Sequence, residues 1–263
     1  MVKARVPLDP VADLKRRLNR EATERARAFW ERQLRGRGKY RGVSMPKVRA
    51  CVQTWWDDHL LAHTPASVGK RIAIALIEQT MVEDKLAGIL VLQEQLGDQL
   101  RATDLPMFAR LFAAGHLAEF NAVDWFAVRV LVTLLEHQAG RADAVRVISQ
   151  WRGADSIWQR RAACLAFTGL AAAGEDAMPG LTSIILTVCA TVVWSHERFD
   201  QTAVGWVLRE LSRSEPERVE MFFRTHARFM SKECARSAVE KLPAARRNEL
   251  LAHHKRATTI RRL

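Results

Sequence analysis

Asp124 is the acidic residue whose surroundings first suggest chemistry. It lies within residues 120–126 (FNAVDWF), where its neighbours are apolar or aromatic. In a helix Asp124 is one turn beyond Phe120, so the carboxylate and the ring share one face. A carboxylate crowded by apolar side chains must be paired, hydrated or functional. On local grounds a salt-bridged or capping aspartate competes with a catalytic one.

Residues 39–49 (KYRGVSMPKVR) form a second segment whose residue types could bind a ligand. A glycine, a serine at the N-cap position and a following proline lie among basic residues. This combination is typical of a helix N-terminus that receives a phosphate. The alternative is an ordinary capped helix start.

Two further segments pair a tryptophan with arginine or glycine. In residues 158–163 (WQRRAA), Trp158 and Arg161 are three positions apart and adjacent on a helix surface, and a guanidinium there can grip a phosphate. The alternative is a core tryptophan beside solvated arginines. In residues 203–212 (AVGWVLRELS), Gly205 precedes Trp206, and a helical glycine costs about 1 kcal/mol relative to alanine. It suggests close approach by a partner or by a neighbouring helix.

The elements that carry these segments are predicted to be helices throughout. Asp9 and Pro10 start an amphipathic helix over about 9–35, followed by Ser44-Met45-Pro46 at the start of the next. No run alternates with period two, so the fold class is all-α. Beyond residue 45, helices are expected over 46–56, 69–80, 83–97, 104–115, 122–138, 141–150, 156–173, 178–193, 199–213, 215–228, 231–241 and 243–256.

Such short helices pack either as a globular bundle or as a solenoid of helical pairs. Paired helices would repeat about every 40 residues, within the range of HEAT and armadillo repeats. We expect residues 1–263 to form a single domain. It carries a basic N-terminal helix (about 9–35) and a basic C-terminal tail (about 255–263).

The net charge of +12 is carried by the two ends of the chain. Residues 1–49 hold 15 Lys and Arg against 5 Asp and Glu, and residues 241–263 hold 7 against 1. The middle holds the remaining 19 against 23, a net charge of −4. Basic ends suit a polyanionic partner, because each cation that meets a phosphate releases counterions. A solubilising tail is the alternative.

Several protein classes are excluded by composition. Apolar residues make up 48% of the chain and charged residues 27%, which is typical of a folded protein. The N-terminus lacks the apolar stretch of a signal peptide, and the longest apolar run, residues 181–194, is too short to span a bilayer. The four scattered cysteines form no CxxC pair, so we expect a cytoplasmic protein without disulfides or structural zinc.

Taken together and in order, the four segments resemble those of the AlkD-type DNA alkylation-repair glycosylases. Residues 40–49 look like that family's F-L-G-[IV]-x-[ST]-P-x-x-R, and residues 120–124 match its W-D-x-V-D. Residues 158–163 match W-x-x-R-A-A, and residues 203–210 match A-[IV]-G-W-x-L-R-E. The resemblance extends over roughly residues 25–242. The acidic helix at 83–97 also fits the family in character.

The resemblance implies a HEAT-like solenoid whose concave face binds double-stranded DNA. It implies catalytic roles for Asp124 and two aromatic residues, Trp206 and Phe120, and a DNA-steadying role for Arg161. Phe120 stands where the family usually has tryptophan, and Asn121 where it has an acid. No metal or cofactor is implied. The further expected DNA-binding residues are Tyr40, Lys47, Arg49, Trp158 and Arg209.

The activity implied is hydrolysis of the N-glycosidic bond of cationic N3- or N7-alkylated purines in base-excision repair. Bulky natural-product adducts are a variant substrate of the same class. The enzyme is expected to be a nucleoid-associated monomer. A non-catalytic protein that recognises distorted or branched DNA is the alternative, and a HEAT-like protein-interaction scaffold is a third hypothesis.

Overall fold

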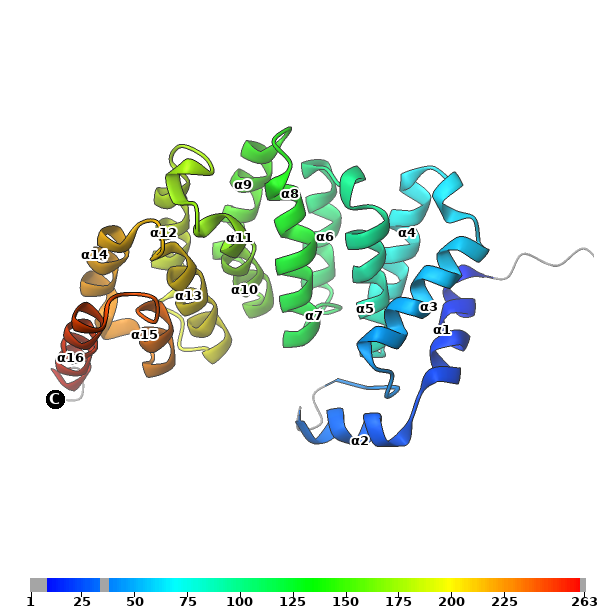
Figure 1. The fold of residues 1–263 in the computed structure, drawn as a ribbon, viewed down its shortest axis with the longest axis horizontal. Coiled ribbons are helices and arrows are strands. Elements are labelled where there is room, and N and C mark those ends of the chain that lie inside the picture. Colours follow the sequence, from blue (N-terminus) through cyan, green and yellow to red (C-terminus); the bar gives the residue numbers. More distant parts are fainter. Residues whose placement is uncertain (1–8, 34–37, 261–263) are drawn as a thin grey trace, which may run out of the picture. The chain divides into compact units, whose positions relative to one another are not determined.

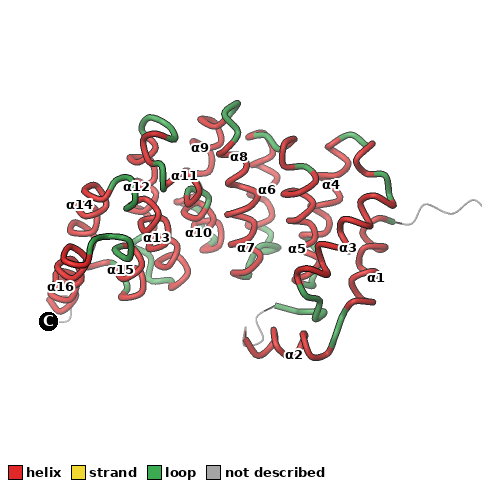
Figure 2. The backbone as a smooth tube through the Cα atoms, in the orientation of Figure 1, coloured by secondary structure: helices red, strands yellow, loops and turns green. Residues whose placement is uncertain are grey.

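The computed structural model describes residues 9–33 and 38–260, and these residues form α-helices joined by short loops and single turns (Figure 1). Figure 2 shows helices and loops but no strand among the described residues. An isolated parallel bridge joins Lys39 and Met81. The predicted all-α class is confirmed.

The helices divide between two compact units. Unit 1 comprises Met1–Leu100 and Ala114–Trp125, and unit 2 comprises Arg101–Ala113 and Phe126–Leu263. The expectation of one repeat domain over 1–263 stays a prediction. The helices of unit 1 are α1 (Pro10–Glu21), α2 (Glu24–Gln33), α3 (Met45–Asp58), α4 (Ala66–Ile77), α5 (Val82–Leu90) and α7 (Phe120–Trp125). Those of unit 2 are α6 (Leu105–Ala113), α8 (Val132–Glu136), α9 (Arg141–Gln150), α10 (Ile157–Leu165), α11 (Thr168–Ala171), α12 (Leu181–Val192), α13 (Arg198–Leu211), α14 (Pro216–His226), α15 (Lys232–Ala238) and α16 (Ala244–Ile260).

The N-terminal helix expected over 9–35 is two helices, because the chain becomes extended at Ala22, where ψ is 140°. The adjoining Thr23 is held from outside the helix: its N–H donates to the Gly42 carbonyl at 3.0 Å. The Thr23 hydroxyl also accepts the N–H of Ala26 at 3.3 Å, which caps α2. A tertiary contact therefore interrupts a continuous amphipathic stripe. Residues 34 and 35 of the expected helix lie outside the described residues.

Other expected boundaries also change. The helix expected over 122–138 contains a π-helical segment, Phe126–Leu131, between α7 and α8. The helix expected over 156–173 is divided into α10 and α11. The expected basic tail from residue 255 is the last part of helix α16 as far as Ile260, and residues 261–263 lie outside the described residues.

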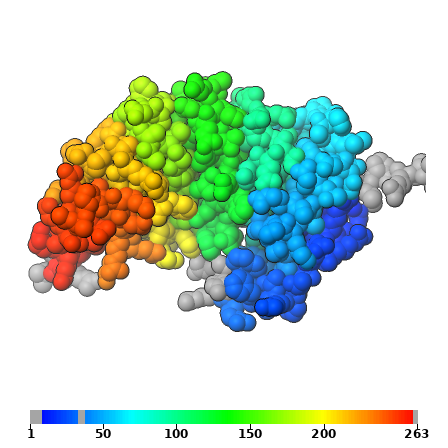
Figure 3. Space-filling model, viewed as in Figure 1, coloured from blue at the N-terminus to red at the C-terminus, as the bar shows by residue number. Residues whose placement is uncertain are grey.

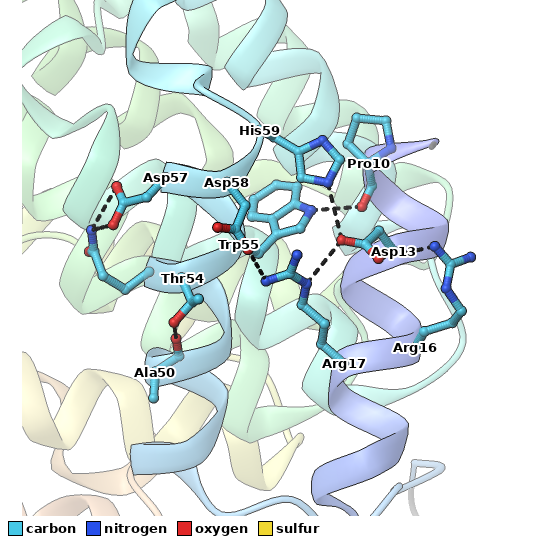
Figure 4. Close-up of polar contacts among 11 residues, drawn as sticks. Pro10, Asp13, Arg16, Arg17, Ala50, Thr54, Trp55, Asp57, Asp58 and His59 are labelled. Carbon is cyan, nitrogen blue, oxygen red and sulfur yellow. Dashed lines mark hydrogen bonds and ion pairs between the residues drawn. The ribbon is translucent and has the colours of Figure 1, made fainter. Parts of the chain in front are cut away.

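Helices α1 and α3 are joined by a polar network around Asp13 (Figure 4). The Asp13 carboxylate accepts hydrogen bonds from Arg17 at 2.9 Å and Arg16 at 3.0 Å, and its Oδ2 lies 3.1 Å from the His59 ring nitrogen. Arg17 continues the network to Asp58 at 2.7 Å. A carboxylate that is 9% exposed requires such partners, so the network fixes the pairing of the two helices.

The longest apolar stretch of the sequence, expected to be a buried helix, forms α12 in unit 2, which buries only one face, because Ser183, Thr187 and Thr191 are exposed. Its apolar side chains that face the core are at most 1% exposed: Leu181, Ile185, Val188, Cys189 and Val192. Among the described residues no helix is long and apolar enough to cross a membrane. The C-terminal helices α15 and α16, orange and red in Figure 3, lie at the surface of unit 2.

Candidate functional site

Asp124 and Phe120 lie one turn apart on α7 in unit 1, and both side chains are half-buried. Between them Ala122 and Val123 are fully buried, and α7 packs against α5. The apolar residues therefore hold the helix in the core while the ring and the carboxylate stay partly accessible. The predicted sharing of one helix face is confirmed by this register.

Glu119 caps the N-terminus of α7. Its carboxylate accepts the N–H of Asn121 at 2.9 Å and that of Ala122 at 3.2 Å. A negative charge at this end of a helix satisfies unpaired donors and complements the helix dipole. Burial raises the pKa of Glu119, and the nearby charge of Asp124 raises it further, against the two backbone hydrogen bonds and Lys85. Asp124 thus has a second carboxyl group nearby.

The residue after Asp124 anchors the other end of the helix. The indole N–H of Trp125 donates to the side chain of Gln93 at 3.1 Å. Gln93 lies in the π-helical segment Val91–Gln95 that follows α5. Such π-helical insertions occur frequently at functional sites. Asp124 is therefore positioned between a carboxylate cap and an indole anchor.

Tyr40 lies inside unit 1, with 5% of its surface exposed. Its ring stacks on Trp30 at a centroid distance of 6.0 Å. Burial raises the pKa of Tyr40, as do the charges of Glu119 and Glu83, while the side chain of Asn121 acts in the opposite direction. Asn121, the neutral departure from the family's acid, therefore lies in an already acidic environment. Tyr40 itself offers almost no surface to DNA.

The segment that precedes α3 is built around buried Glu83. The Glu83 carboxylate accepts the N–H groups of Arg41, Gly42 and Val43 at 2.9, 2.8 and 3.1 Å. Gly42 has a φ of +89°, and a Cβ there would lie 2.6 Å from the Arg27 nitrogen. The loop thus needs glycine, and its donors, which could have held a phosphate, bind a protein carboxylate.

Asp84 holds the same segment through its side chain. Its carboxylate binds the Arg41 guanidinium at 2.6 and 3.1 Å, and Arg41 also donates to Asn19. Glu83 and Asp84 are 2% and 1% exposed. Sequence reasoning treated this acidic helix only as a family feature. The sequence did offer a signal for these two residues: two adjacent acids stand at the start of an otherwise apolar helix. Carboxylates buried there require hydrogen-bond or ion-pair partners elsewhere in the chain.

Lys47 and Arg49 are surface residues of α3, as the predicted role in DNA binding requires. Lys47 pairs with Glu21 at 2.8 Å, and Arg49 pairs with Glu94 at 2.8 Å. About half of each cationic side chain remains exposed. Exposed ion pairs of this kind are weak and can exchange partners. These two residues are accessible in a way that Tyr40 is not.

In unit 2, Trp158 and Arg161 lie on α10, which packs against α13. The Trp158 ring lies 4.7 Å from the ring of Phe199. Arg161 is 5% exposed and donates to the Phe199 carbonyl at 2.7 Å and to the Thr202 hydroxyl at 2.9 Å. These contacts attach α10 to the start of α13. A direct phosphate contact by Arg161 stays a prediction.

Trp206 and Arg209 lie one turn apart on α13. Trp206 is half-buried, and the Arg209 guanidinium lies 5.9 Å from the centre of its ring. Arg209 also pairs with Glu210 at 2.8 Å and with Glu240 at 3.6 Å. The cation and the aromatic face thus form one surface element of unit 2.

Gly205, which precedes Trp206, is explained by helix packing. A Cβ at this position would lie 2.9 Å from the Cys234 carbonyl oxygen and 3.0 Å from its Cα, on α15. The glycine therefore allows α13 and α15 to approach closely. The sequence suggested close approach either by a partner or by a neighbouring helix, and the neighbouring helix α15 accounts for the glycine.

The predicted site residues divide between the two units. Unit 1 contains Asp124, Phe120, Tyr40, Lys47 and Arg49, and unit 2 contains Trp158, Arg161, Trp206 and Arg209. The described residues contain no group of three or more His, Cys, Asp or Glu side chains arranged to hold a metal ion. His254, from the basic end of the sequence, lies with its ring nitrogen 3.0 Å from the Met230 carbonyl oxygen.

Comparison with known proteins adds two findings. A family model described as DNA alkylation repair enzyme matches residues 14–242. The solved structure titled a predicted DNA alkylation repair enzyme from Enterococcus faecalis is similar in fold, with a TM-score of 0.72 and 17% sequence identity. The similarity covers 85% of this chain and 98% of that one. No curated protein sequence matches the chain.

Proposed function

The chain belongs to the family of DNA alkylation repair enzymes, and from this premise we propose that it is a DNA N-glycosylase that removes cationic alkylated purines. The substrates are purines alkylated at N3 or N7, within double-stranded DNA. The observation that carries the proposal is the placement of Asp124. It is a half-buried carboxylate, one helical turn from an aromatic ring, on a helix capped by Glu119.

The proposed reaction needs little help at the leaving group. Alkylation at N3 or N7 gives the base a positive charge, so it departs as a neutral base with the electrons of the glycosidic bond. The sugar acquires oxocarbenium character, as in glycoside hydrolysis. Water then bonds to the anomeric carbon and loses a proton, which leaves an abasic site. The Asp124 carboxylate stabilises the developing positive charge and orients this water.

Two aromatic residues complete the proposed catalytic set. Phe120 presents a ring next to Asp124 on α7, and Trp206 is the second aromatic residue, assigned from its position in the AVGWVLRE motif. Aromatic faces attract a cationic sugar. Lys47, Arg49 and Arg209 are proposed contacts of the DNA backbone. Trp158 and Arg161 are also proposed to bind DNA, and they attach α10 to α13. We propose that the protein acts as a monomer on chromosomal DNA in the cytoplasm.

The deciding experiment measures free base released from methylated duplex DNA by the wild type and by Asp124→Asn. We expect the substitution to abolish release while duplex binding persists, because it removes charge with little change of shape. Asp143→Asn is the matched control, since Asp143 is a surface residue of α9 paired with Arg146. Release by Asp124→Asn at the wild-type rate would contradict the assignment. Duplex binding by a wild type that releases no base would support the alternative, a non-catalytic DNA-binding protein.

A further inference from the structure

A cavity of about 630 Å³ lies between α15 and α16 in unit 2, apart from the residues assigned above. Lys232 and Arg236 line it from α15, where they are one turn apart. Lys255 lines it from α16. All three side chains are exposed, and no acidic residue is among those that line the cavity. We refer to this cavity as the C-terminal groove.

The three cations of the groove differ from three arginines of α13, α14 and α16 that form ion pairs. Arg198 pairs with Glu233 at 2.7 Å, Arg224 with Glu249 at 2.6 Å, and Arg246 with Glu220 at 2.9 Å. Within residues 9–33 and 38–260, no carboxylate lies within ion-pair distance of Lys232, Arg236 or Lys255. The groove therefore concentrates positive charge that the fold does not balance.

Lys255 lies on a helix that is anchored in the core of unit 2 and not on a free tail. Leu250 of α16 is fully buried. The ring of His254 is buried too, and it contacts the carbonyl of Met230, which lies directly after the 3₁₀ turn Ala227–Phe229. Lys255 directly follows His254 in the helix. Its position is thus fixed by core contacts of α16. Lys255 lies beyond residue 242, where the match to the family model ends, whereas Lys232 and Arg236 lie within the matched residues.

The groove is also connected to the proposed DNA-binding surface of unit 2. Helix α15 packs against α16 on one side and closely against α13 at Gly205 on another. Helix α13 carries Trp206 and Arg209. A polyanion that contacts Arg209 therefore has a second cluster of cations on the next helix of the same unit.

We propose that the C-terminal groove binds phosphates of the DNA backbone and extends the DNA contact of unit 2 from α13 to α15 and α16. The choice of DNA as the source of the phosphates rests on the proposed function. Each phosphate neutralised by a cation contributes about 0.9 to the slope of log affinity against log salt. Three groove contacts contribute roughly 2.7, which corresponds to roughly a 40-fold loss of affinity between 50 and 200 mM salt.

The test compares two triple variants that lose the same charge. The groove variant is Lys232→Gln, Arg236→Gln and Lys255→Gln, and the matched control is Arg198→Gln, Arg224→Gln and Arg246→Gln, whose cations are already paired. The affinity for an unmodified duplex is measured by fluorescence anisotropy over a range of salt concentrations. We expect the slope to fall by about 2 to 3 in the groove variant and by less than about 1 in the control.

The outcomes separate this proposal from the proposed function. Equal slopes in the two variants, or no binding of the duplex by the wild type, would overturn the groove assignment, whether or not the wild type releases methylated bases. A reduced slope in the groove variant supports it even if no base is released. Lys255→Gln alone should lower the slope by about 1, which guards against misfolding of the triple variant. Calorimetric binding of inorganic phosphate together with an unchanged duplex slope would assign the groove to small phosphorylated ligands and would also overturn the proposal.

Discussion

Glu119 and Asp124 occupy the two ends of one short helix in unit 1. The Glu119 carboxylate accepts the first N–H groups of α7, and the charge of Asp124 contributes to the raised pKa of Glu119. The cap that positions the proposed catalytic carboxylate is thus itself sensitive to pH. This relationship could not be read from the FNAVDW segment alone, because Glu119 lies outside it.

The raised pKa of Glu119 predicts a pH-dependent effect of Glu119→Gln on stability. A carboxyl whose pKa is higher in the folded state favours folding most when protonated, and this contribution is lost as the pH rises through the folded-state pKa. The free energy of unfolding of the variant minus that of the wild type should therefore be larger at pH 7 than at pH 4. Urea unfolding at the two pH values measures the difference. The control is Glu24→Gln, at an exposed ion pair with Arg27, which should change the free energy of unfolding little at either pH. An effect of Glu119→Gln that is equal at the two pH values would refute the prediction.

Phe120 is predicted to contribute an aromatic face rather than a specific polar contact. Phe120→Ala should lower base release by about 2- to 30-fold, the range expected for attraction between a ring and a cation. Phe120→Trp should retain the activity, because it keeps the ring and restores the residue usual in the family. Single-turnover release from methylated duplex measures both. Phe29→Ala, at an exposed ring of α2, is the control, and an unchanged rate in Phe120→Ala would remove Phe120 from the catalytic set.

Gly205 is predicted to be required for the close packing of α13 against α15. Gly205→Ala puts a Cβ 2.9 Å from the Cys234 carbonyl oxygen and should lower the free energy of unfolding by about 1 to 3 kcal/mol. Gly153→Ala is a matched control, because no atom lies within 4 Å of the added Cβ. The control should leave stability unchanged or slightly raised. Denaturant unfolding of both variants tests this, and equal stabilities would show that the α13–α15 contact tolerates a methyl group.

Asp13 is predicted to stabilise unit 1 at neutral pH and to lose this effect in acid. Burial by itself would raise the pKa of Asp13, but hydrogen bonds from His59, Arg17 and Arg16 outweigh it and hold the pKa below its usual value (Figure 4). A lowered pKa gives a contribution that is present above the unfolded-state pKa of about 3.9 and lost as the pH falls through the folded-state value.

Asp13→Asn should therefore lower the free energy of unfolding by about 1 to 3 kcal/mol at pH 7. The difference from the wild type should shrink below about pH 4, where the wild-type carboxyl becomes protonated. Asp143→Asn, at an exposed pair on α9, should cost less than about 1 kcal/mol. A difference between Asp13→Asn and wild type that persists unchanged at pH 2 would contradict this account.

The amino-acid sequence by itself determined the all-α class and the register of the site segments. Apolar residues at intervals of three and four, with breaks such as Thr64-Pro65, depend on local geometry and on which face is buried, so they can be read along the chain. The same periodicity placed Phe120 and Asp124 on one face of α7, and Trp206 one turn before Arg209 on α13. The order of the four motifs indicated the family.

Only the tertiary structure decided how the polar groups are paired. Residues distant in sequence divide the first helix at Thr23, fill the loop before α3 with Glu83, bury Tyr40 and Arg161, and bring the cations of α15 and α16 to one groove. A hydrogen bond or an ion pair depends on partners that can lie 40 or more positions away, as Glu83 does from Gly42. Periodicity indicates which face of a helix is buried, but not which side chain or backbone group of another element contacts that face. For that reason the sequence could indicate Asp124, while the partners of Glu83 and the gathering of Lys232, Arg236 and Lys255 in one groove became visible only in the fold.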